Sequence, residues 1–170
     1  KGTAAIVEFP GVLYRGGVEQ KIRQYMIDNN FVDSIIQLPQ DLFFGTSIAT
    51  CILVLKKNKT DNSILFVDAS NEYTRNTNKN KLSEENINNI VGLLKDRKSV
   101  ESKSYLAMYD EVKENDYNIS VNTYLKTNME DSIIDIEEVN KKLSEIIPKQ
   151  QQLRKEIEEI IKELNGDYHE

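Results

Sequence analysis

Short apolar runs, separated by turns and one amphipathic stretch, mark the first forty residues of the chain. Residues 4–9 form an apolar run closed by Pro10-Gly11, which is typical of a buried strand followed by a turn. A helix ending near Asn29 should come next. Its apolar face is made of Val18, Ile22, Tyr25 and Met26. Because the apolar run 32–38 then predicts a second strand, we expect a crossover unit of two parallel strands and half of a doubly wound, Rossmann-like α/β sheet.

Predicted strands and helices continue as far as residue 128. Residues 48–57 predict a third strand, and a polar turn separates it from a fourth at residues 64–67, so these two should form a β-hairpin. The Asn-rich stretch at 71–81 predicts a polar loop. Ser83, followed by two glutamates, has the pattern of a helix N-cap. The buried stripe of that helix should be Ile87, Ile90, Val91 and Leu94. Weaker patterns predict strands at 105–108 and 119–121 and a helical turn at 110–113.

Beyond Met129 the apolar spacing changes to an alternation of three and four, which is typical of a coiled-coil seam. The seam consists of Ile136, Val139, Leu143, Ile146, Gln150, Leu153, Ile157, Ile160 and Leu164. Pro148 lies within it and predicts a kink or a break into two helices. We therefore expect a body at residues 1–128 and a helical tail at 129–170. The seam needs a partner, which is the body of the same chain, a second copy or another subunit.

Composition places the chain among ordinary soluble proteins, with 39% hydrophobic and 29% charged residues in 170. The longest apolar run, 51–55, is far shorter than a membrane span. Cys51, the single cysteine, has no disulfide partner within the chain, which fits a cytoplasmic protein. The start of the sequence lacks an initiator Met and reaches a strand almost at once, so we expect a portion of a longer protein.

The net charge of −6 is concentrated in the tail, which contains twelve acidic and six basic residues, while the body is neutral. Any contact with nucleic acid must therefore use local basic clusters or other parts of an assembly. The candidates are Lys56, Lys57, Lys59, Arg75, Lys79 and Lys81. The alternative is that these residues are the solvated ends of hairpins.

Few residues are suited to catalysis. The single histidine, His169, is next to the last residue, and one histidine with one cysteine cannot form a zinc site. Without a histidine partner, Ser47 and Ser70 do not suggest a hydrolytic triad. No phosphate-binding loop of an ATPase is present. We expect Glu8 and Asp68 to be strand-end residues.

An adjacent aromatic pair, Phe43 and Phe44, lies in the segment that joins the second and third predicted strands. Neighbouring side chains of an extended backbone point in opposite directions. One ring should therefore face the core, leaving the other at the end of the sheet and free for stacking. The alternative is that both rings are core residues and Gly45 only permits a turn.

These motifs, in this order, resemble the modification (M) subunits of Type I restriction enzymes, which are adenine-specific DNA methyltransferases. The resemblance lies in six segments: the strand, Pro-Gly-Val-Leu turn and Arg-Gly-Gly of residues 4–17, then residues 36–48, 50–57 and 66–70, the stretch 80–82 before the capped helix, and the stretch 114–120 before Tyr124. The match spans nearly the whole chain, and the ordered series is more specific than any one segment.

The resemblance implies a methyl transfer from S-adenosylmethionine to the exocyclic amine (N6) of adenine in DNA. The family holds the cofactor with a Gly-rich loop and the adenine with an Asn/Asp-Pro-Pro-Phe/Tyr motif, and neither occurs here. The chain then corresponds to the part downstream of both and should be inactive alone. By its position before the third strand, Phe43 corresponds best to the family's base-stacking aromatic, with Phe44 as the second candidate.

The resemblance also implies partners: DNA, a specificity (S) subunit joined through the helical tail, a further M subunit and a restriction (R) subunit. The competing interpretation is a non-catalytic α/β interaction module that presents a coiled-coil arm, with the phenylalanine pair in its core.

Overall fold

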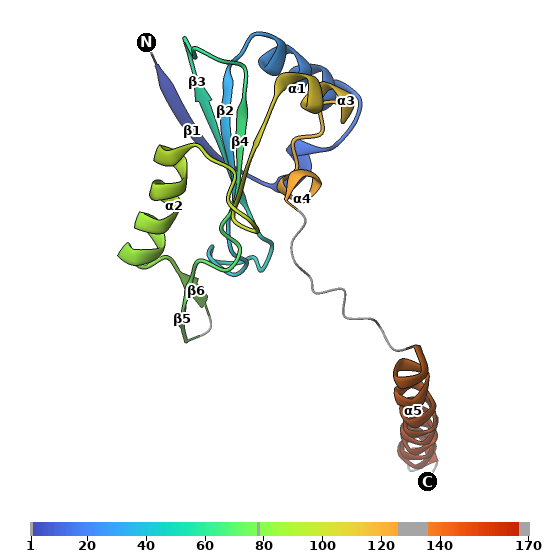
Figure 1. Cartoon of the computed structure of the whole chain (residues 1–170). Coiled ribbons are helices and arrows are strands. Elements are labelled where there is room, and N and C mark those ends of the chain that lie inside the picture. The colour runs from blue at the N-terminus through green and yellow to red at the C-terminus, as the bar shows by residue number, and fades with distance from the viewer. Residues whose placement is uncertain (1, 78, 126–135, 167–170) are drawn as a thin grey trace. The chain divides into compact units, whose positions relative to one another are not determined.

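The computed structural model describes residues 2–77, 79–125 and 136–166, with the side chains of the C-terminal helix described at 143–158 and 161. The chain divides into two units, Lys1–Thr127 and Asn128–Glu170. The first is an α/β body built on a five-stranded sheet (Figure 1). The described residues of the second form one long helix.

The sheet of the body has the order β1-β3-β2-β4-β7. Its strands are β1 (Thr3–Glu8), β2 (Val32–Gln37), β3 (Cys51–Lys56), β4 (Ile64–Asp68) and β7 (Ser104–Ala107). Among the described strands only β2 and β4 pair in parallel, so the sheet is mostly antiparallel, whereas the sequence pattern predicted half of a doubly wound sheet with one hairpin. β1 and β2 do run in the same direction, but β3 lies between them.

The expected hairpin between the third and fourth strands is wrong. β3 pairs with β1 and β2, whereas β4 lies on the far side of β2. The connection crosses the end of β2, where the ammonium of Lys59 donates to the carbonyl oxygens of Val32 at 2.6 Å and Ser63 at 2.7 Å. A polar connection fits a hairpin and a crossing equally well, so local composition did not distinguish them.

One face of the sheet is covered by four short helices (Figure 1). They are the 3₁₀ helix Pro10–Leu13, α1 (Val18–Asp28), α3 (Tyr109–Glu114) and α4 (Val121–Tyr124). At the centre of this core the rings of Phe66 and Tyr124 stack with centroids 3.9 Å apart. The strand expected at 119–121 is wrong, because Ile119 makes one backbone bond to Leu13 and Val121 already begins α4.

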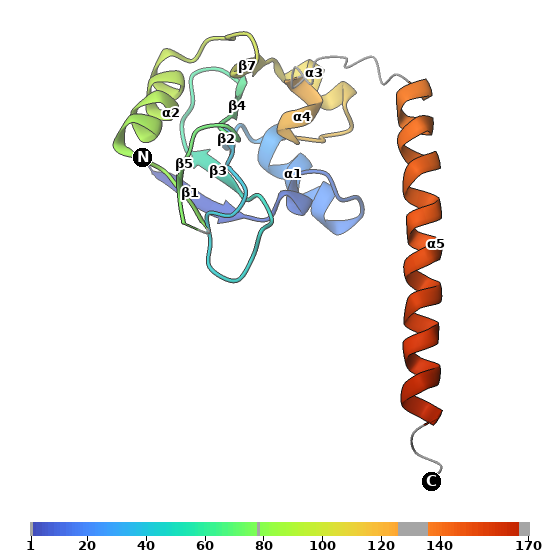
Figure 2. The ribbon, with the colours of Figure 1, turned by 90° about the horizontal axis from the view of Figure 1, so that it is seen from below.

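The other face is covered by α2 (Glu84–Asp96), which packs Ile90 against Leu65 and Val67 (Figures 1 and 2). Ser83 caps this helix as predicted: its hydroxyl accepts from the backbone N–H of Asn86, whose side chain accepts from the backbone of Ser83. The predicted stripe is only partly buried, since Ile87 is 45% exposed.

β1 is an edge strand and not the buried strand that its apolar run predicted. Ile6 is 39% exposed and Val7 is 51% exposed. Shallow apolar grooves border the strand on both faces, one of about 270 Å³ that includes Ile6 and one of about 300 Å³ that includes Ala5. An apolar run indicates a buried strand only when neighbouring elements cover both faces of that strand. The described residues leave both faces of β1 partly uncovered.

The Asn-rich stretch is not an irregular loop. Within it β5 (Thr74–Asn76) and β6 (Lys79–Lys81) pair antiparallel as a separate two-stranded sheet (Figure 1). Its residues have low strand propensity, so contacts outside the hairpin stabilise it.

The helix of the second unit, α5, runs without a break from Ile136 to Gly166 (Figure 2). Pro148 lies inside it, so of the two outcomes expected there, a kink or a break into two helices, the break is wrong. Runs of good helix formers on both sides of the proline favour continuity. Leu143, Ile146, Leu153 and Ile157 are each 48% to 59% exposed. Among the described residues, no helix combines the length and apolarity that a bilayer crossing requires.

Candidate functional site

The carboxyl ends of β1, β2 and β4 meet at one edge of the sheet, because these three strands share a direction. The strands end there at Glu8, Gln37 and Asp68. Ligand sites of open α/β sheets form at this edge, from the loops that follow the strands. Two segments lie here: residues 38–50, called the aromatic loop below, and the β5–β6 hairpin (Figure 1).

The aromatic loop is fixed at its base and turns sharply at its tip. The backbone N–H of Leu38 donates to the carbonyl of Thr50 at 2.9 Å, which closes the base. Both residues are buried. Near the tip, Asp41 and Gly45 have positive φ angles of 57° and 81°. Glycine adopts this conformation without the steric cost that a side chain brings.

Both phenylalanine rings at the tip are exposed. Phe43 is 42% exposed, and Phe44 is fully exposed at 101%. The expectation that one ring faces the core is therefore wrong, and so is the alternative that both do. The expectation assumed an extended backbone, whereas residues 43–45 form a bend and a turn. Phe44 thus has both ring faces free.

The β5–β6 hairpin holds the aromatic loop through Asn80, whose side chain is buried. The backbone N–H of Asn80 donates to the carbonyl of Asp41 at 3.0 Å, and its side-chain amide donates to the carbonyl of Gln40 at 2.8 Å. The amide oxygen accepts from the guanidinium of Arg75 at 3.1 Å. Asn80 belongs to the stretch 80–82 that resembles the family, but the sequence predicted no role for its side chain, because one Asn in an Asn-rich stretch carries no distinguishing signal.

Basic side chains of the hairpin lie beside the aromatic loop. The carboxylate of Asp41 is 3.7 Å from Arg75 and 3.9 Å from Lys79. Lys79 also donates to the carbonyl of Thr46 at 3.2 Å, and Lys81 is exposed at the end of β6. Exposed ion pairs of this length contribute little stability. Three predicted basic candidates and the aromatic pair are therefore brought to the same edge of the sheet.

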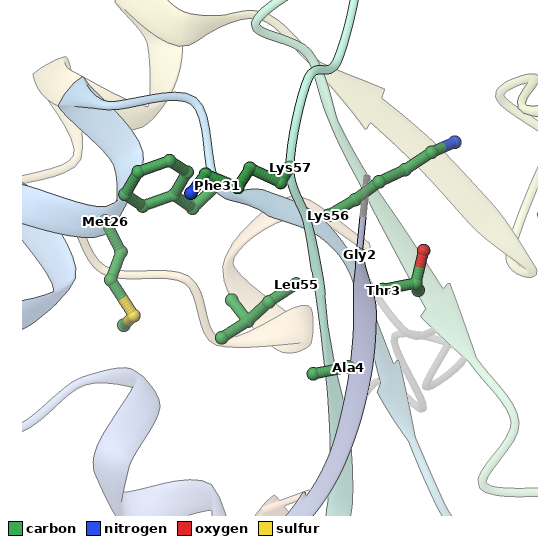
Figure 3. Close-up of a pocket in the computed structure, with 8 residues that line it drawn as sticks. All are labelled: Gly2, Thr3, Ala4, Met26, Phe31, Leu55, Lys56 and Lys57. Atoms are coloured by element: carbon green, nitrogen blue, oxygen red, sulfur yellow. The ribbon is translucent and has the colours of Figure 1, made fainter.

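The other three basic candidates lie at the opposite edge. Lys56 is the last residue of β3 and Lys57 follows it, so the length of this strand separates them from the aromatic loop by about 17 Å. They line a mostly apolar pocket of about 380 Å³ together with Met26, Phe31 and Leu55 (Figure 3). Burial lowers the pKa of Lys59, whose ammonium is already bound by backbone carbonyls. The six basic candidates thus lie in two separate groups, at opposite ends of the strands.

The carboxylates near the site have structural partners. Asp68 accepts from the backbone N–H of Ser70 at 2.9 Å, and Glu72 accepts from the side chains of Asn86 and Asn89, each at 3.1 Å. Within residues 2–77, 79–125 and 136–166, no group of three or more potential ligands is placed to hold a metal ion. Burial, with a smaller contribution from Glu8, raises the pKa of Cys51 to about 11, so this thiol is not a nucleophile at neutral pH.

Comparison with known proteins identifies the family. Residues 1–132 match the family described as N-6 DNA Methylase. The chain belongs to this family. It is 44% identical over 169 residues to the Type I restriction enzyme MpnII methylase subunit of Mycoplasma pneumoniae, covering 99% of this chain and 31% of that protein. It is 34% identical to the MjaVIII methylase subunit of Methanocaldococcus jannaschii, covering 96% and 29%.

The fold of this N-6 DNA methylase chain is also found among solved structures. The methyltransferase subunit of a type I restriction-modification system from Streptococcus thermophilus superposes with a TM-score of 0.72 at 38% identity, over 73% of this chain and 26% of that one. The chain covers only 26% to 31% of the length of these relatives. The family assignment disfavours the alternative of a non-catalytic interaction module.

Proposed function

We propose that this chain is the DNA-contacting, base-stacking part of a Type I restriction-modification methyltransferase subunit. The whole protein transfers a methyl group from S-adenosylmethionine to the N6 amine of adenine in DNA. The family match and the relatives named as methylase subunits support the reaction class. The observation that carries the role of this part is the fully exposed Phe44 on a loop anchored beside basic side chains.

An exposed aromatic ring at this edge suits a base that has left the duplex. Enzymes that modify a base must extrude it, at a cost of a few kcal/mol. Stacking on an aromatic side chain returns about 1–3 kcal/mol per base, without sequence preference. The resemblance favoured Phe43, but its ring is partly covered, so we assign the stacking role to Phe44. Arg75, Lys79 and Lys81 would contact the phosphates on either side.

The methyl donor is assigned to other parts of the whole protein. A Gly-rich cofactor loop and an Asn/Asp-Pro-Pro-Phe/Tyr tetrapeptide are both missing from this sequence. Two carboxylates that follow β4, Asp68 and Glu72, already accept hydrogen bonds from neighbouring groups. The chain by itself should therefore not methylate DNA.

Phe44→Ala in the full-length subunit tests this proposal. With 2-aminopurine at the target position, the fluorescence rise on DNA binding should fall, because losing about 1–3 kcal/mol of stacking shifts the extrusion equilibrium about 5- to 150-fold. The affinity for S-adenosylmethionine should not change. Phe43→Ala is the matched control, with a smaller expected effect. If Phe43→Ala abolishes the fluorescence rise and Phe44→Ala leaves it unchanged, the stacking role belongs to Phe43. If neither substitution changes the fluorescence rise, the stacking proposal is refuted.

The tail is proposed to join the specificity subunit. Its described seam residues, Leu143, Ile146, Leu153 and Ile157, are exposed apolar side chains at coiled-coil spacing. The side chains of Ile136, Val139, Ile160 and Leu164 lie outside the described residues. Leu153→Glu with Ile157→Glu should prevent co-purification of the specificity subunit, whereas Glu156→Lys on a polar position should have a small effect. Intact assembly with both glutamates would favour packing of the tail within its own chain.

A further inference from the structure

The β5–β6 hairpin has an unusual composition for a two-stranded sheet. Its two strands contain three residues each, all polar, and none belongs to either hydrophobic core. Its buried position is occupied by the polar residue Asn80 and not by an apolar one. A two-stranded hairpin is marginally stable alone. Contacts with the rest of the body must therefore stabilise this hairpin.

The hairpin contacts the aromatic loop on both sides of its phenylalanine pair. Before the pair, Asn80 binds the carbonyls of Gln40 and Asp41. After the pair, Lys79 binds the carbonyl of Thr46. The hairpin thus contacts the segment that carries the rings on both sides, although the bonded residues are 40 and 33 positions apart in sequence. Bracketing at two points restricts the tip far more than closure of the loop base alone.

We propose that Asn80 is a positioning residue that presets Phe44 for stacking on the extruded base. The inference rests on the proposed function. A free loop would have to be ordered when the base leaves the duplex, and that entropic cost would oppose extrusion. The side-chain amide of Asn80 removes this cost in advance by donating to Gln40 while accepting from Arg75. Asn80 touches neither DNA nor cofactor in this role.

The chemistry of the amide allows an isosteric test. Asn80→Asp keeps the size of the side chain and the acceptor for Arg75, but a carboxylate cannot donate to the carbonyl of Gln40. The backbone bond to Asp41 stays in place. The matched control is Asn76→Asp, which adds the same charge to the same hairpin at an exposed residue on β5.

The experiment uses the full-length subunit with its specificity subunit and a duplex with 2-aminopurine at the target base. Asn80→Asp should reduce the fluorescence rise about fivefold relative to Asn76→Asp, which corresponds to one hydrogen bond of about 1 kcal/mol. Both substitutions add one negative charge to the hairpin, so both should weaken overall DNA binding to the same extent. Amide exchange of residues 40–48 should be faster in Asn80→Asp and in the uncharged Asn80→Ala, and unchanged in Asn76→Asp. Adding Asn80→Ala to Phe44→Ala should cause no further loss.

The two proposals fail in different ways. If Phe44→Ala loses the signal but Asn80→Asp and Asn80→Ala behave like Asn76→Asp, the positioning role is refuted and the stacking role remains. If Phe44→Ala keeps the full signal, the stacking role is refuted, and positioning with it. A drop in the thermal midpoint without faster exchange of residues 40–48 would show that Asn80 only stabilises the fold, and would also refute the inference.

Discussion

Arg23→Met should lower the free energy of unfolding of the body by about 3 kcal/mol. Arg23 lies on α1, is 3% exposed and donates to the carbonyls of Tyr117 at 3.0 Å and Val12 at 2.8 Å. It thereby ties the helix to two connecting segments. Hydrogen bonds from a charged group contribute about 1.5–3 kcal/mol each, so the pair accounts for about 3–6 kcal/mol. Burial of the charge offsets part of this sum, and the same burial lowers the pKa of Arg23.

Methionine preserves most of the volume and the unbranched shape of the side chain. The decrease in the free energy of unfolding therefore measures mainly the two hydrogen bonds. Urea unfolding of the full-length subunit, followed by circular dichroism, should show a midpoint lower by about 1–2 M. Lys21→Met on the exposed face of the same helix is the control and should change the midpoint little. A loss under about 1 kcal/mol for Arg23→Met, or one equal to that of Lys21→Met, would contradict the reasoning.

Three further predictions follow from other parts of the body. With the pKa of Cys51 raised from 9.0 to about 11, native protein at pH 8 should react with iodoacetamide about 100-fold more slowly than urea-unfolded protein, and comparable rates would contradict the burial of this thiol. Burial, with the nearby Glu111, raises the pKa of Tyr124 above its ordinary 10.0. Stability should therefore be complete below pH 10 and fall above it, because only the unfolded chain releases this proton there. Urea midpoints measured between about pH 8 and pH 11 should fall less steeply in Tyr124→Phe than in the unmodified protein. Ser83→Ala should cost about 1 kcal/mol in urea unfolding by removing the N-cap of α2, and no loss would contradict the capping role.

Elements with strong local signals were predictable from the sequence. The apolar face and the following Asn pair located α1, and Ser83 with its glutamates located the start of α2. β2 began and ended within one residue of its apolar run. In each case, neighbours in sequence determine the structure. The aromatic pair was recognised as a candidate site for the same reason, since its composition is distinctive.

Features that depend on distant partners were not predictable in this way. The pairing of β3 with β1 and β2 depends on edge geometry that an apolar run does not encode. The exposure of both phenylalanines depends on a turn that breaks the alternation of an extended strand. Asn80 acquires its importance only because folding brings Gln40 within 2.8 Å of it. The sequence named six basic candidates but could not show that the sheet separates them into two groups.

The position of β1 at the margin of the sheet affects how the body behaves when produced alone. An uncovered edge carries unpaired backbone donors and acceptors, and here it is accompanied by the exposed side chains of Ile6 and Val7. Such edges template pairing between molecules and lead to aggregation. The isolated body should therefore precipitate at high concentration. Val7→Lys, which places a charge on the strand, should keep it monodisperse in light scattering.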